Sequence, residues 1–370
     1  MNKHQKHAKL KLRDNDNFAP NEIAIVGTKC DVISNLVNQV AEKLTSYKLA
    51  YFDASHNDNV QPHFLQKYTF HTKGSAAILI NSAVNKFNQR IQFSQNDFVF
   101  INGNHYEGAK QILILDNEKY ASVLKRLDQL NNIQFVIKLT DDSKYFDFLE
   151  EKHPQIKNLL CYKIGEIDKI SKHIENLIKE KIAPIQGLVL AGGKSTRMGT
   201  DKGTLNFYGK NQREIAIELL EKHHLKTYLS VREEQEIGIS NKITDKFLGL
   251  GPFGAICSAF QENPDVAWLV LATDLPFVND EVINLLLKHR NPSKIATTIK
   301  GKNKEFPEPL ITIWEPKSYP ILLNYLAQGY SCPRKVLLNS AIEIIEVDDN
   351  LIRNINTPDE FKAARKEIND

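Results

Sequence analysis

The chain has 370 residues, of which 42% are hydrophobic and 25% are charged, and its formal net charge is +3. This length suits two domains better than one, and the composition is that of a globular protein. The small net charge does not indicate a nucleic-acid partner, and no apolar run reaches the roughly 18 residues of a membrane span. We therefore expect partners other than nucleic acid or membrane.

The first 20 residues are polar and basic, and we expect a disordered tail there. They lack the apolar core of a signal peptide. The four cysteines are scattered and form no Cys-x-x-Cys pair, so neither a zinc site nor a disulfide framework is indicated. These features predict a cytoplasmic protein.

Strand and helix patterns alternate over residues 21–182. Strands are predicted at residues 23–26, 49–52, 76–80, 97–101, 111–115, 134–138 and 159–162. Helices are predicted at residues 32–44, 119–130 and 167–179. Such alternation is typical of a mostly parallel sheet with helices on both faces, a three-layer α/β domain. Pro184 and a fading helical pattern before it mark a domain boundary.

A second α/β domain is predicted over residues 185–370. Its strands are expected at residues 188–191, 227–231, 243–245, 267–272, 295–299, 310–314 and 342–347, and its helices at 214–220 and 255–260. A closing helix begins at Pro358, where Thr357 can cap the N-terminus and Glu360 can complete a capping box. Both domains therefore belong to the α/β class with mostly parallel sheets.

The most informative stretch of the second domain is residues 187–202. Its apolar strand ends in Gly192 and Gly193, and three cations follow at Lys194, Arg197 and Lys202. Glycine backbone can bring its N–H groups close to a ligand, and fixed cations can share the charge of a triphosphate. The stretch is not a Walker A loop, since no Gly-Lys-Ser/Thr closes it, and its glycine spacing is not that of a dinucleotide site.

Asp274 stands at the carboxyl end of the predicted strand 267–272, the edge where open α/β sheets bind ligands. A triphosphate needs a divalent metal, and Mg²⁺ usually takes one or two carboxylates together with phosphates and water. Asp274 is therefore the candidate metal ligand and Asp201 a weaker one, although an aspartate here could also cap a loop. The implied chemistry is displacement at a nucleoside phosphate, which depends on positioning and charge stabilisation.

Residues 190–202, Leu-Ala-Gly-Gly-Lys-Ser-Thr-Arg-Met-Gly-Thr-Asp-Lys, closely resemble the signature of the molybdenum cofactor guanylyltransferases, the MobA-type nucleotidyltransferases. The segments at 251–254, 273–276, 308–310 and 354–360 are also similar to stretches of that family. The resemblance implies a Rossmann-like domain that transfers GMP from Mg²⁺-bound GTP to the terminal phosphate of molybdopterin and releases pyrophosphate. Enzymes that supply molybdopterin and chaperones of molybdoenzymes are the further partners it implies.

The resemblance also implies roles for single residues. The nucleotide would contact Leu190, Ala191, Gly192, Gly193, Lys202, Asp245 and Asp274. In the reaction, Lys202 would contact the phosphates, Arg197 would assist, Asp274 would hold Mg²⁺ and Asp245 would contact the guanosine. Asn354 and Asn356 would lie on the molybdopterin side, or would simply be turn-forming residues beside a capped helix. Gly192 favours guanine, because cytidylyl relatives tend to carry alanine there.

The first domain resembles the MobB-type GTP-binding partner of these enzymes. Residues 23–27 open a helix as a P-loop does, and residues 97–103 are similar to a MobB segment, with Asn102 in place of the acid. A Walker A loop that starts at Gly27 would need glycine and lysine where Val32 and Ile33 stand. We therefore expect residues 21–182 to be a degenerate P-loop domain that binds or docks without hydrolysing GTP.

Two other functions are compatible with these residues. One is a different nucleotidyltransferase, which acts on a sugar phosphate or uses CTP as a cofactor cytidylyltransferase. The other is a non-catalytic carrier of molybdopterin, against which the presence of both Lys202 and Asp274 argues.

Overall fold

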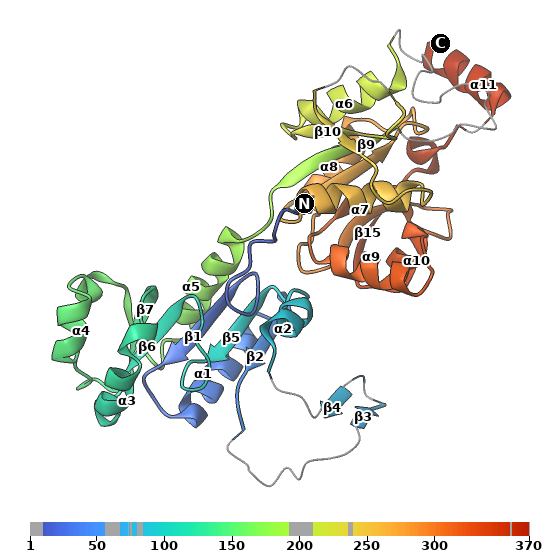
Figure 1. Ribbon diagram of the computed structural model, residues 1–370. Coiled ribbons are helices and arrows are strands. Elements are labelled where there is room, and N and C mark those ends of the chain that lie inside the picture. The colour runs from blue at the N-terminus through green and yellow to red at the C-terminus, as the bar shows by residue number, and fades with distance from the viewer. Residues whose placement is uncertain are drawn as a thin grey trace, which may run out of the picture. The chain divides into compact units, whose positions relative to one another are not determined.

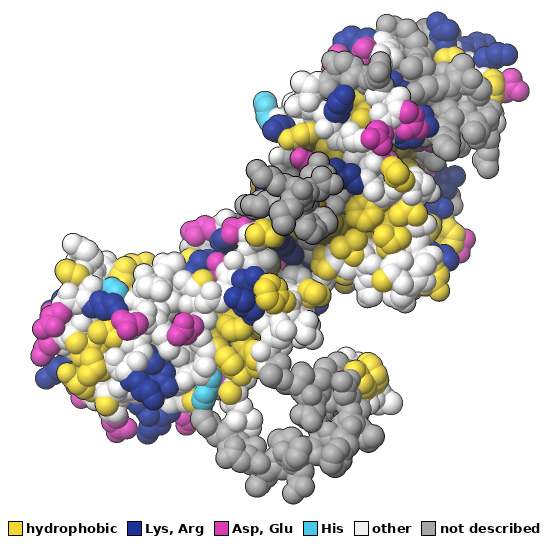
Figure 2. Space-filling model, viewed as in Figure 1, with side chains coloured by type: hydrophobic (Ala, Val, Ile, Leu, Met, Phe, Trp, Pro, Cys, Tyr) yellow, Lys and Arg dark blue, Asp and Glu magenta, His cyan; other side chains and the backbone are white. Residues whose placement is uncertain are grey.

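The computed structural model describes residues 10–55, 67–72, 74, 76–79, 84–191, 210–235, 240–355 and 357–369 (Figure 1). The chain divides into two compact units, Asn15–Lys181 and Met1–Asp14 together with Ile182–Asp370. We call them the N-terminal unit and the C-terminal unit. Figure 2 shows Lys, Arg, Asp and Glu side chains on the visible face of each unit. Among the described residues, no helix has both the length and the apolar character to cross a membrane.

The N-terminal unit is built on a six-stranded sheet in the order β2-β5-β1-β6-β7-β8. Every pairing in this sheet is parallel. The strands are β1 Glu22–Val26, β2 Leu49–Phe52, β5 Phe98–Asn102, β6 Gln111–Leu115, β7 Ile133–Lys138 and β8 Cys161–Lys163. The helices are α1 Cys30–Lys43, α2 Lys86–Phe93, α3 Tyr120–Lys125, α4 Asp147–Lys152 and α5 Ile167–Glu180.

Both faces of this sheet are buried, because alternate residues of each strand point to opposite sides. One set, which includes Ile23, Ile25 and Phe100, packs with α1 and α5. The other set, which includes Ala24 and Val26, packs with residues of α3 and α4. The three-layer arrangement predicted for this part of the chain is confirmed.

The structure differs from the sequence prediction at two elements of this unit. The strand expected at 76–80 is β4 Ala76–Leu79, which pairs with β3 Lys67–Phe70 in a separate antiparallel pair and not in the main sheet. The helix expected at 119–130 is divided into α3 and two flanking 3₁₀ turns, Asn117–Lys119 and Leu127–Gln129. Lys119 and Arg126 each adopt φ −107° and ψ 14°, which interrupts the α-helical hydrogen bonds.

The basic segment before β1 is not a free tail over its described part. The buried Glu22 carboxylate accepts hydrogen bonds from the N–H groups of Asn17, Phe18 and Ala19, at 3.1, 2.7 and 2.8 Å. Ala19 is 1% exposed. Residues 15–20 are therefore part of the N-terminal unit, which begins before the expected boundary at residue 21. In the C-terminal unit, Lys11 Nζ donates to Asn263 Oδ1 at 2.6 Å.

The C-terminal unit contains a seven-stranded sheet in the order β11-β10-β9-β12-β14-β13-β15. Its strands are β9 Ile185–Leu190, β10 Thr227–Val231, β11 Lys242–Thr244, β12 Ala267–Ala272, β13 Ala296–Gly301, β14 Glu308–Trp314 and β15 Ile342–Val347. Strand β14 is antiparallel to both of its neighbours, and the remaining pairings are parallel. The α/β class with parallel-dominated sheets is therefore confirmed.

Helices cover both faces of this second sheet. They are α6 Gln212–Lys222, α7 Pro252–Glu262, α8 Asp280–Lys288, α9 Ser318–Ala327 and α10 Pro333–Leu338. A further helix, α11 Pro358–Asn369, packs in a small separate cluster with Ile355 and Phe277. One core joins α6 and α8 to the sheet, and the other joins α7, α9 and α10 to it. Strand β12 is buried at every position, so it forms the centre of the unit. The predicted capping box is confirmed, since Thr357 N donates to Glu360 Oε2 and Glu360 N to Thr357 Oγ1.

Candidate functional site

The candidate site lies where the carboxyl ends of β9, β10, β11 and β12 meet at one edge of the second sheet. These four strands are neighbours and parallel, so the residues that follow them converge. Because β14 runs in the opposite direction, its first residue lies at the same edge. The edge therefore brings together Ala191, Asp245, Asp274 and Glu308.

The end of β9 is fixed by its neighbours. Ala191 N donates to Ser230 O at 3.1 Å, and Gln235 Nε2 donates to Ala191 O at 3.1 Å. Thr273 Oγ1 donates to Leu190 O at 3.2 Å. Leu190 and Ala191 are thus held at the edge immediately before the glycine loop. Several predicted site residues lie outside the described residues: Gly192, Gly193, Lys194, Arg197, Asp201, Lys202 and Asn356.

Asp245 directly follows β11, and its backbone N–H donates to Val231 O at 2.9 Å. Its Oδ1 accepts a hydrogen bond from Ser230 Oγ at 3.0 Å. Burial raises the pKa of Asp245 above its usual value, while the Ser230 hydrogen bond and the charge of Arg232 oppose that rise. The carboxylate is therefore oriented by a hydroxyl group in a half-buried place on the strand edge, where a ligand could displace the remaining water.

The predicted glycine loop at 249–254 forms the turn that enters α7. Gly251 has φ +57°, a conformation that favours glycine, and Pro252 occupies the first position of the helix. A Cβ at Gly254 would lie 2.3 Å from Phe247 O, so no larger side chain fits without movement of the backbone. These constraints bring the N-terminus of α7 close to the strand end that carries Asp245.

Asp274 and Glu308 face each other across the β12–β14 ladder. The register pairs Trp268 with Trp314 and Leu271 with Ile311, so its continuation places Asp274 opposite Glu308. Burial raises the pKa of Glu308, and the negative charge of Asp274 raises it further. The hydrogen bond from Leu310 N–H and the positive charge of Arg334 lower this pKa, but by less. Two carboxylates therefore share this part of the edge.

The asparagine segment near the C-terminus is tied to Asp274 through the backbone. Ile355 N donates to Asp274 O at 2.9 Å. This hydrogen bond brings Asn354 next to the strand end, as the sequence pattern suggested for the far side of the site. Asn354 and Asp274 are thus parts of one edge, although 80 residues separate them in the chain.

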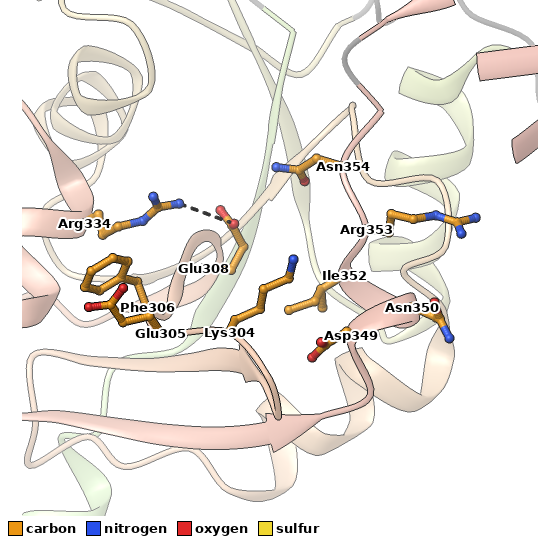
Figure 3. Close-up of a pocket in the computed structure, with 10 residues that line it drawn as sticks. All are labelled: Lys304, Glu305, Phe306, Glu308, Arg334, Asp349, Asn350, Ile352, Arg353 and Asn354. Carbon is orange, nitrogen blue, oxygen red and sulfur yellow. Dashed lines mark ion pairs between the residues drawn. The ribbon is translucent and has the colours of Figure 1, made fainter. Parts of the chain in front are cut away.

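A pocket with a volume of about 480 Å³ opens beside Glu308 and Asn354 (Figure 3). Its lining consists of polar and charged side chains with two apolar ones: Lys304, Glu305, Phe306, Glu308, Arg334, Asp349, Asn350, Ile352, Arg353 and Asn354. Arg334 Nη2 lies 3.8 Å from Glu308 Oε2. In Figure 3, the Lys304 side chain extends between Glu308 and Ile352, whereas the Arg353 side chain points away. Arg353 instead lies over the Phe277 ring, 4.2 Å from its centroid.

The two carboxylates are suited to bind a Mg²⁺ ion that is also coordinated by the phosphates of a nucleoside triphosphate. Mg²⁺ prefers oxygen ligands and usually takes one or two carboxylates, the others being phosphate oxygens and water. Asp274 and Glu308 could supply such ligands. Within the described part of the chain, no group of three His, Cys, Asp or Glu residues could hold a metal by itself. The donors that the described residues provide are therefore too few for a metal held by them alone, and sufficient for one shared with a triphosphate.

Glu308 and Arg334 were not among the residues predicted for the site. Glu308 precedes Pro309 at the start of a strand, but a sequence does not show that this strand is antiparallel to its neighbour. Only the reversal of β14 brings its first residue to the edge where the parallel strands end. The similarity of residues 308–310 to a stretch of the guanylyltransferase family was the signal available for Glu308.

Comparison with known proteins finds relatives of the C-terminal unit. Residues 187–342 match the family model described as MobA-like NTP transferase domain. A "Molybdenum cofactor biosynthesis bifunctional protein" of Synechocystis sp. is 32% identical over 183 residues, which are 48% of this chain and 53% of that protein. A "Probable molybdenum cofactor guanylyltransferase" of Flavobacterium johnsoniae is 26% identical over 177 residues, 47% of this chain and 92% of that protein.

A solved structure is also similar to this chain: molybdopterin-guanine dinucleotide biosynthesis protein A from Archaeoglobus fulgidus, at 24% identity and a TM-score of 0.42. The match covers 50% of this chain and 98% of that one. This chain spans about half the length of the Synechocystis relative. The family match covers residues 187–342 of the C-terminal unit and does not reach Asn354. The MobB-like character expected of residues 21–182 stays a prediction.

Proposed function

We propose that the C-terminal unit, a nucleotidyltransferase domain, transfers GMP from Mg²⁺-bound GTP to the terminal phosphate of molybdopterin and releases pyrophosphate. One observation carries this proposal. The strand-end carboxylate Asp274, the end of β9 before the glycine loop and the Asn354 segment meet at one edge of the unit that contains the matched residues 187–342. A donor nucleotide and an acceptor phosphate need such an arrangement to react.

The end of β9 supplies the binding site for the triphosphate. Leu190 and Ala191 are held by Thr273 and Gln235, so the loop that follows starts from a fixed point. Gly192 and Gly193 would offer backbone N–H groups to the phosphates, and Arg197 and Lys202 would offer positive charge. Displacement at phosphorus needs little covalent chemistry from a protein, so these groups act by positioning and by stabilising charge.

Asp274 is the residue that would hold the metal. The divalent ion, when bound, neutralises the charge of the triphosphate. Asp274 is placed by β12 and by the hydrogen bond from Ile355 N. Glu308 can contribute a second oxygen, and its raised pKa shows that its negative charge is costly until a cation offsets it. Asp245, oriented by Ser230, would contact the guanosine.

The acceptor would occupy the pocket beside Asn354. Lys304 and Arg334 provide cations there for a phosphate, and Asn354 provides a side chain that both donates and accepts hydrogen bonds. Asn356 would act on the same side. In the reaction, an oxygen of the acceptor phosphate attacks the α-phosphorus of GTP, and pyrophosphate leaves with the electron pair of the broken bond.

The substrate is tested by a panel of reactions with the purified full chain and Mg²⁺. Each nucleoside triphosphate is supplied in turn with molybdopterin or with hexose 1-phosphates, and pyrophosphate release is followed. We expect pyrophosphate release only when GTP is combined with molybdopterin. Release only with a hexose 1-phosphate, or only with CTP, would replace the proposed substrates. Binding of molybdopterin without release under any condition would instead indicate a carrier.

The residue roles are tested by substitution. Lys202→Ala and Asp274→Ala should each lower turnover strongly, by about 100-fold or more, without unfolding the domain. Lys288→Ala is a matched control, because Lys288 is an exposed lysine at the end of α8. Turnover close to the unsubstituted rate in Lys202→Ala or Asp274→Ala would contradict the role assigned to that residue.

For the N-terminal unit we propose a binding or docking role without GTP hydrolysis. The support is that Val32 and Ile33 stand where a Walker A loop starting at Gly27 would have its second glycine and its lysine. Phosphate release from GTP by the full chain carrying Asp274→Ala, in which transfer is blocked, would contradict this proposal.

A further inference from the structure

A second cluster of reactive side chains lies at the carboxyl edge of the N-terminal sheet, and the proposed function does not use it. Cys30 is the first residue of α1, just after β1, and Asp53 directly follows β2. His105 follows β5 on a turn in which its N–H donates to Asn102 O at 3.0 Å. Strands β2, β5 and β1 are neighbours in that order, so the three residues converge at one edge.

The thiol and the imidazole of this cluster are in direct contact. Cys30 Sγ lies 3.3 Å from His105 Nε2, which is hydrogen-bond distance for sulfur. Asp53 Oδ1 lies 3.7 Å from the same nitrogen. A cysteine and a histidine at this distance form the pair from which a protein makes a sulfur nucleophile, because the imidazole accepts the thiol proton.

Further polar groups lie beside the sulfur. Asn104 Nδ2 lies 3.6 Å from Cys30 Sγ and donates to Thr28 O at 2.9 Å, which fixes its direction. Helix α1 has 14 residues, and its N-cap Lys29 makes no side-chain hydrogen bond to the first turn. The N-terminal N–H groups of a helix have no partner within the helix, and they favour an anion at its first residue.

The carboxylate of the cluster is held by its own hydrogen bonds. Tyr51 Oη donates to Asp53 Oδ2 at 2.9 Å, and Ala54 N donates to Asp53 Oδ1 at 2.7 Å. Burial and the adjacent Asp53 raise the pKa of Tyr51 well above its usual value, so this hydroxyl stays a donor. His105 Nε2 therefore faces both the Cys30 thiol and the Asp53 carboxylate.

The backbone just before Cys30 lies very close to the neighbouring strand β6. Gly27 has φ +107°, and a Cβ there would lie 2.2 Å from Ile114 O, so the turn packs directly on β6. The order in which strands are added to the sheet also reverses at β1: β2 and β5 lie on one side of it, and β6, β7 and β8 lie on the other. Such reversal points are where open α/β sheets bind ligands at their carboxyl edge.

We propose that Cys30 is a nucleophile that takes an acyl group from an activated carboxyl compound, an ester or a thioester. The thiol proton passes to His105 Nε2, and the sulfur attacks the carbonyl carbon. A carbon–sulfur bond forms, the bond to the leaving oxygen or sulfur breaks, and that atom takes the proton back from His105. The product is an S-acyl cysteine that water, or a second acceptor, can cleave.

The other cysteines serve as internal controls for this reaction. Cys161 and Cys332 are exposed, so a reagent reaches them more easily than it reaches the partly exposed Cys30. Burial raises the pKa of the Cys257 thiol to about 12, so that thiol is inert at neutral pH. Preferential reaction at Cys30 would therefore reflect its surroundings and not its accessibility.

The test uses the full chain, without nucleotide, and p-nitrophenyl acetate as the acyl probe, with the acetylated cysteine located by peptide mass spectrometry. Acetylation at Cys30 before Cys161 and Cys332 is expected. His105→Gln should slow it roughly 100-fold while the two exposed cysteines react with iodoacetamide at unchanged rates in the same sample. Far-UV circular dichroism confirms that the variant is folded, and Cys30→Ser should abolish the Cys30-dependent burst of p-nitrophenol.

Two results would overturn the proposal. One is acetylation of Cys30 no faster than that of the exposed cysteines, or a rate that His105→Gln leaves unchanged. The other is faster reaction of Cys30 after treatment with a chelator, which would show that the three side chains hold a metal instead. Because no nucleotide is present, neither result bears on the transfer of GMP.

Discussion

The ion pair between Arg290 and Glu315 offers the sharpest test of how the C-terminal unit is held together. Arg290 follows α8, and Glu315 follows β14. Arg290 Nε lies 2.7 Å from Glu315 Oε1, and Nη2 lies 2.8 Å from Oε2, so the pair is bidentate. The side chains are 12% and 2% exposed. Arg290 Nη2 also donates to Ala183 O at 2.7 Å, which links the pair to the chain just before β9.

Glu315→Ala should therefore destabilise this unit strongly. The substitution leaves the buried guanidinium without its carboxylate, which costs about 3–5 kcal/mol in free energy of unfolding. For a unit of this size the loss corresponds to a fall in Tm of about 6–20 °C. Glu262→Ala is the matched control, since Glu262 forms an exposed pair with Lys246 and should change stability by less than about 0.5 kcal/mol.

Urea denaturation followed by tryptophan fluorescence isolates the effect. The chain has two tryptophans, Trp268 and Trp314, and both are buried in the C-terminal unit. Their signal therefore reports the unfolding of this unit and not of the other. An equal free energy of unfolding for Glu315→Ala and Glu262→Ala would refute the inference that this buried ion pair stabilises the unit by joining the end of β14 to the chain before β9.

Further substitutions test the site and its boundary. Glu308→Gln should lower turnover about 10-fold or more, yet stabilise the unit at pH 7, because burial and Asp274 raise the pKa of Glu308 in the folded state. Because the pKa of Glu308 is raised in the folded state, the unsubstituted unit loses stability as the pH rises through that pKa. Near pH 4 Glu308 is largely protonated, so the stability gained by Glu308→Gln should vanish there. Denaturation at pH 4 and pH 7 measures this difference. Thr357→Ala removes the cap of α11 and should cost about 1 kcal/mol in the same denaturation assay. Gly254→Ala should destabilise the unit by more than about 1 kcal/mol, since the new Cβ would meet Phe247 O, and an unchanged midpoint would show that the loop can move.

Much of the architecture follows from local patterns in the sequence. Strand β12 and the carboxylate after it were predictable, because six apolar residues are followed directly by Thr-Asp-Leu-Pro. The cap of α11 was predictable for the same reason, since Thr357 and Glu360 make a local pair whose spacing sets the hydrogen bonds. Such features depend only on residues close in the chain.

What the sequence could not show depends on contacts between distant segments. Glu308 reaches Asp274 only because β14 runs antiparallel to β12. The buried Glu22 carboxylate accepts a hydrogen bond from Ala109 N, 87 residues away in the chain, because β6 lies beside β1. Cys30 and His105 meet because β5 lies beside β1, although 75 residues separate them in the chain. Each case required the order or the direction of strands, which hydrophobic periodicity does not specify.

The most direct test of the central claim is the identity of the product. The purified full chain is incubated with Mg²⁺, GTP and molybdopterin, and the acceptor is examined by mass spectrometry. We expect molybdopterin to gain one guanylyl group with the release of pyrophosphate, and Asp274→Ala to abolish the gain. Recovery of unmodified molybdopterin would contradict the account. Formation of a nucleotidylated hexose phosphate, in a parallel reaction with a hexose phosphate as acceptor, would contradict it as well.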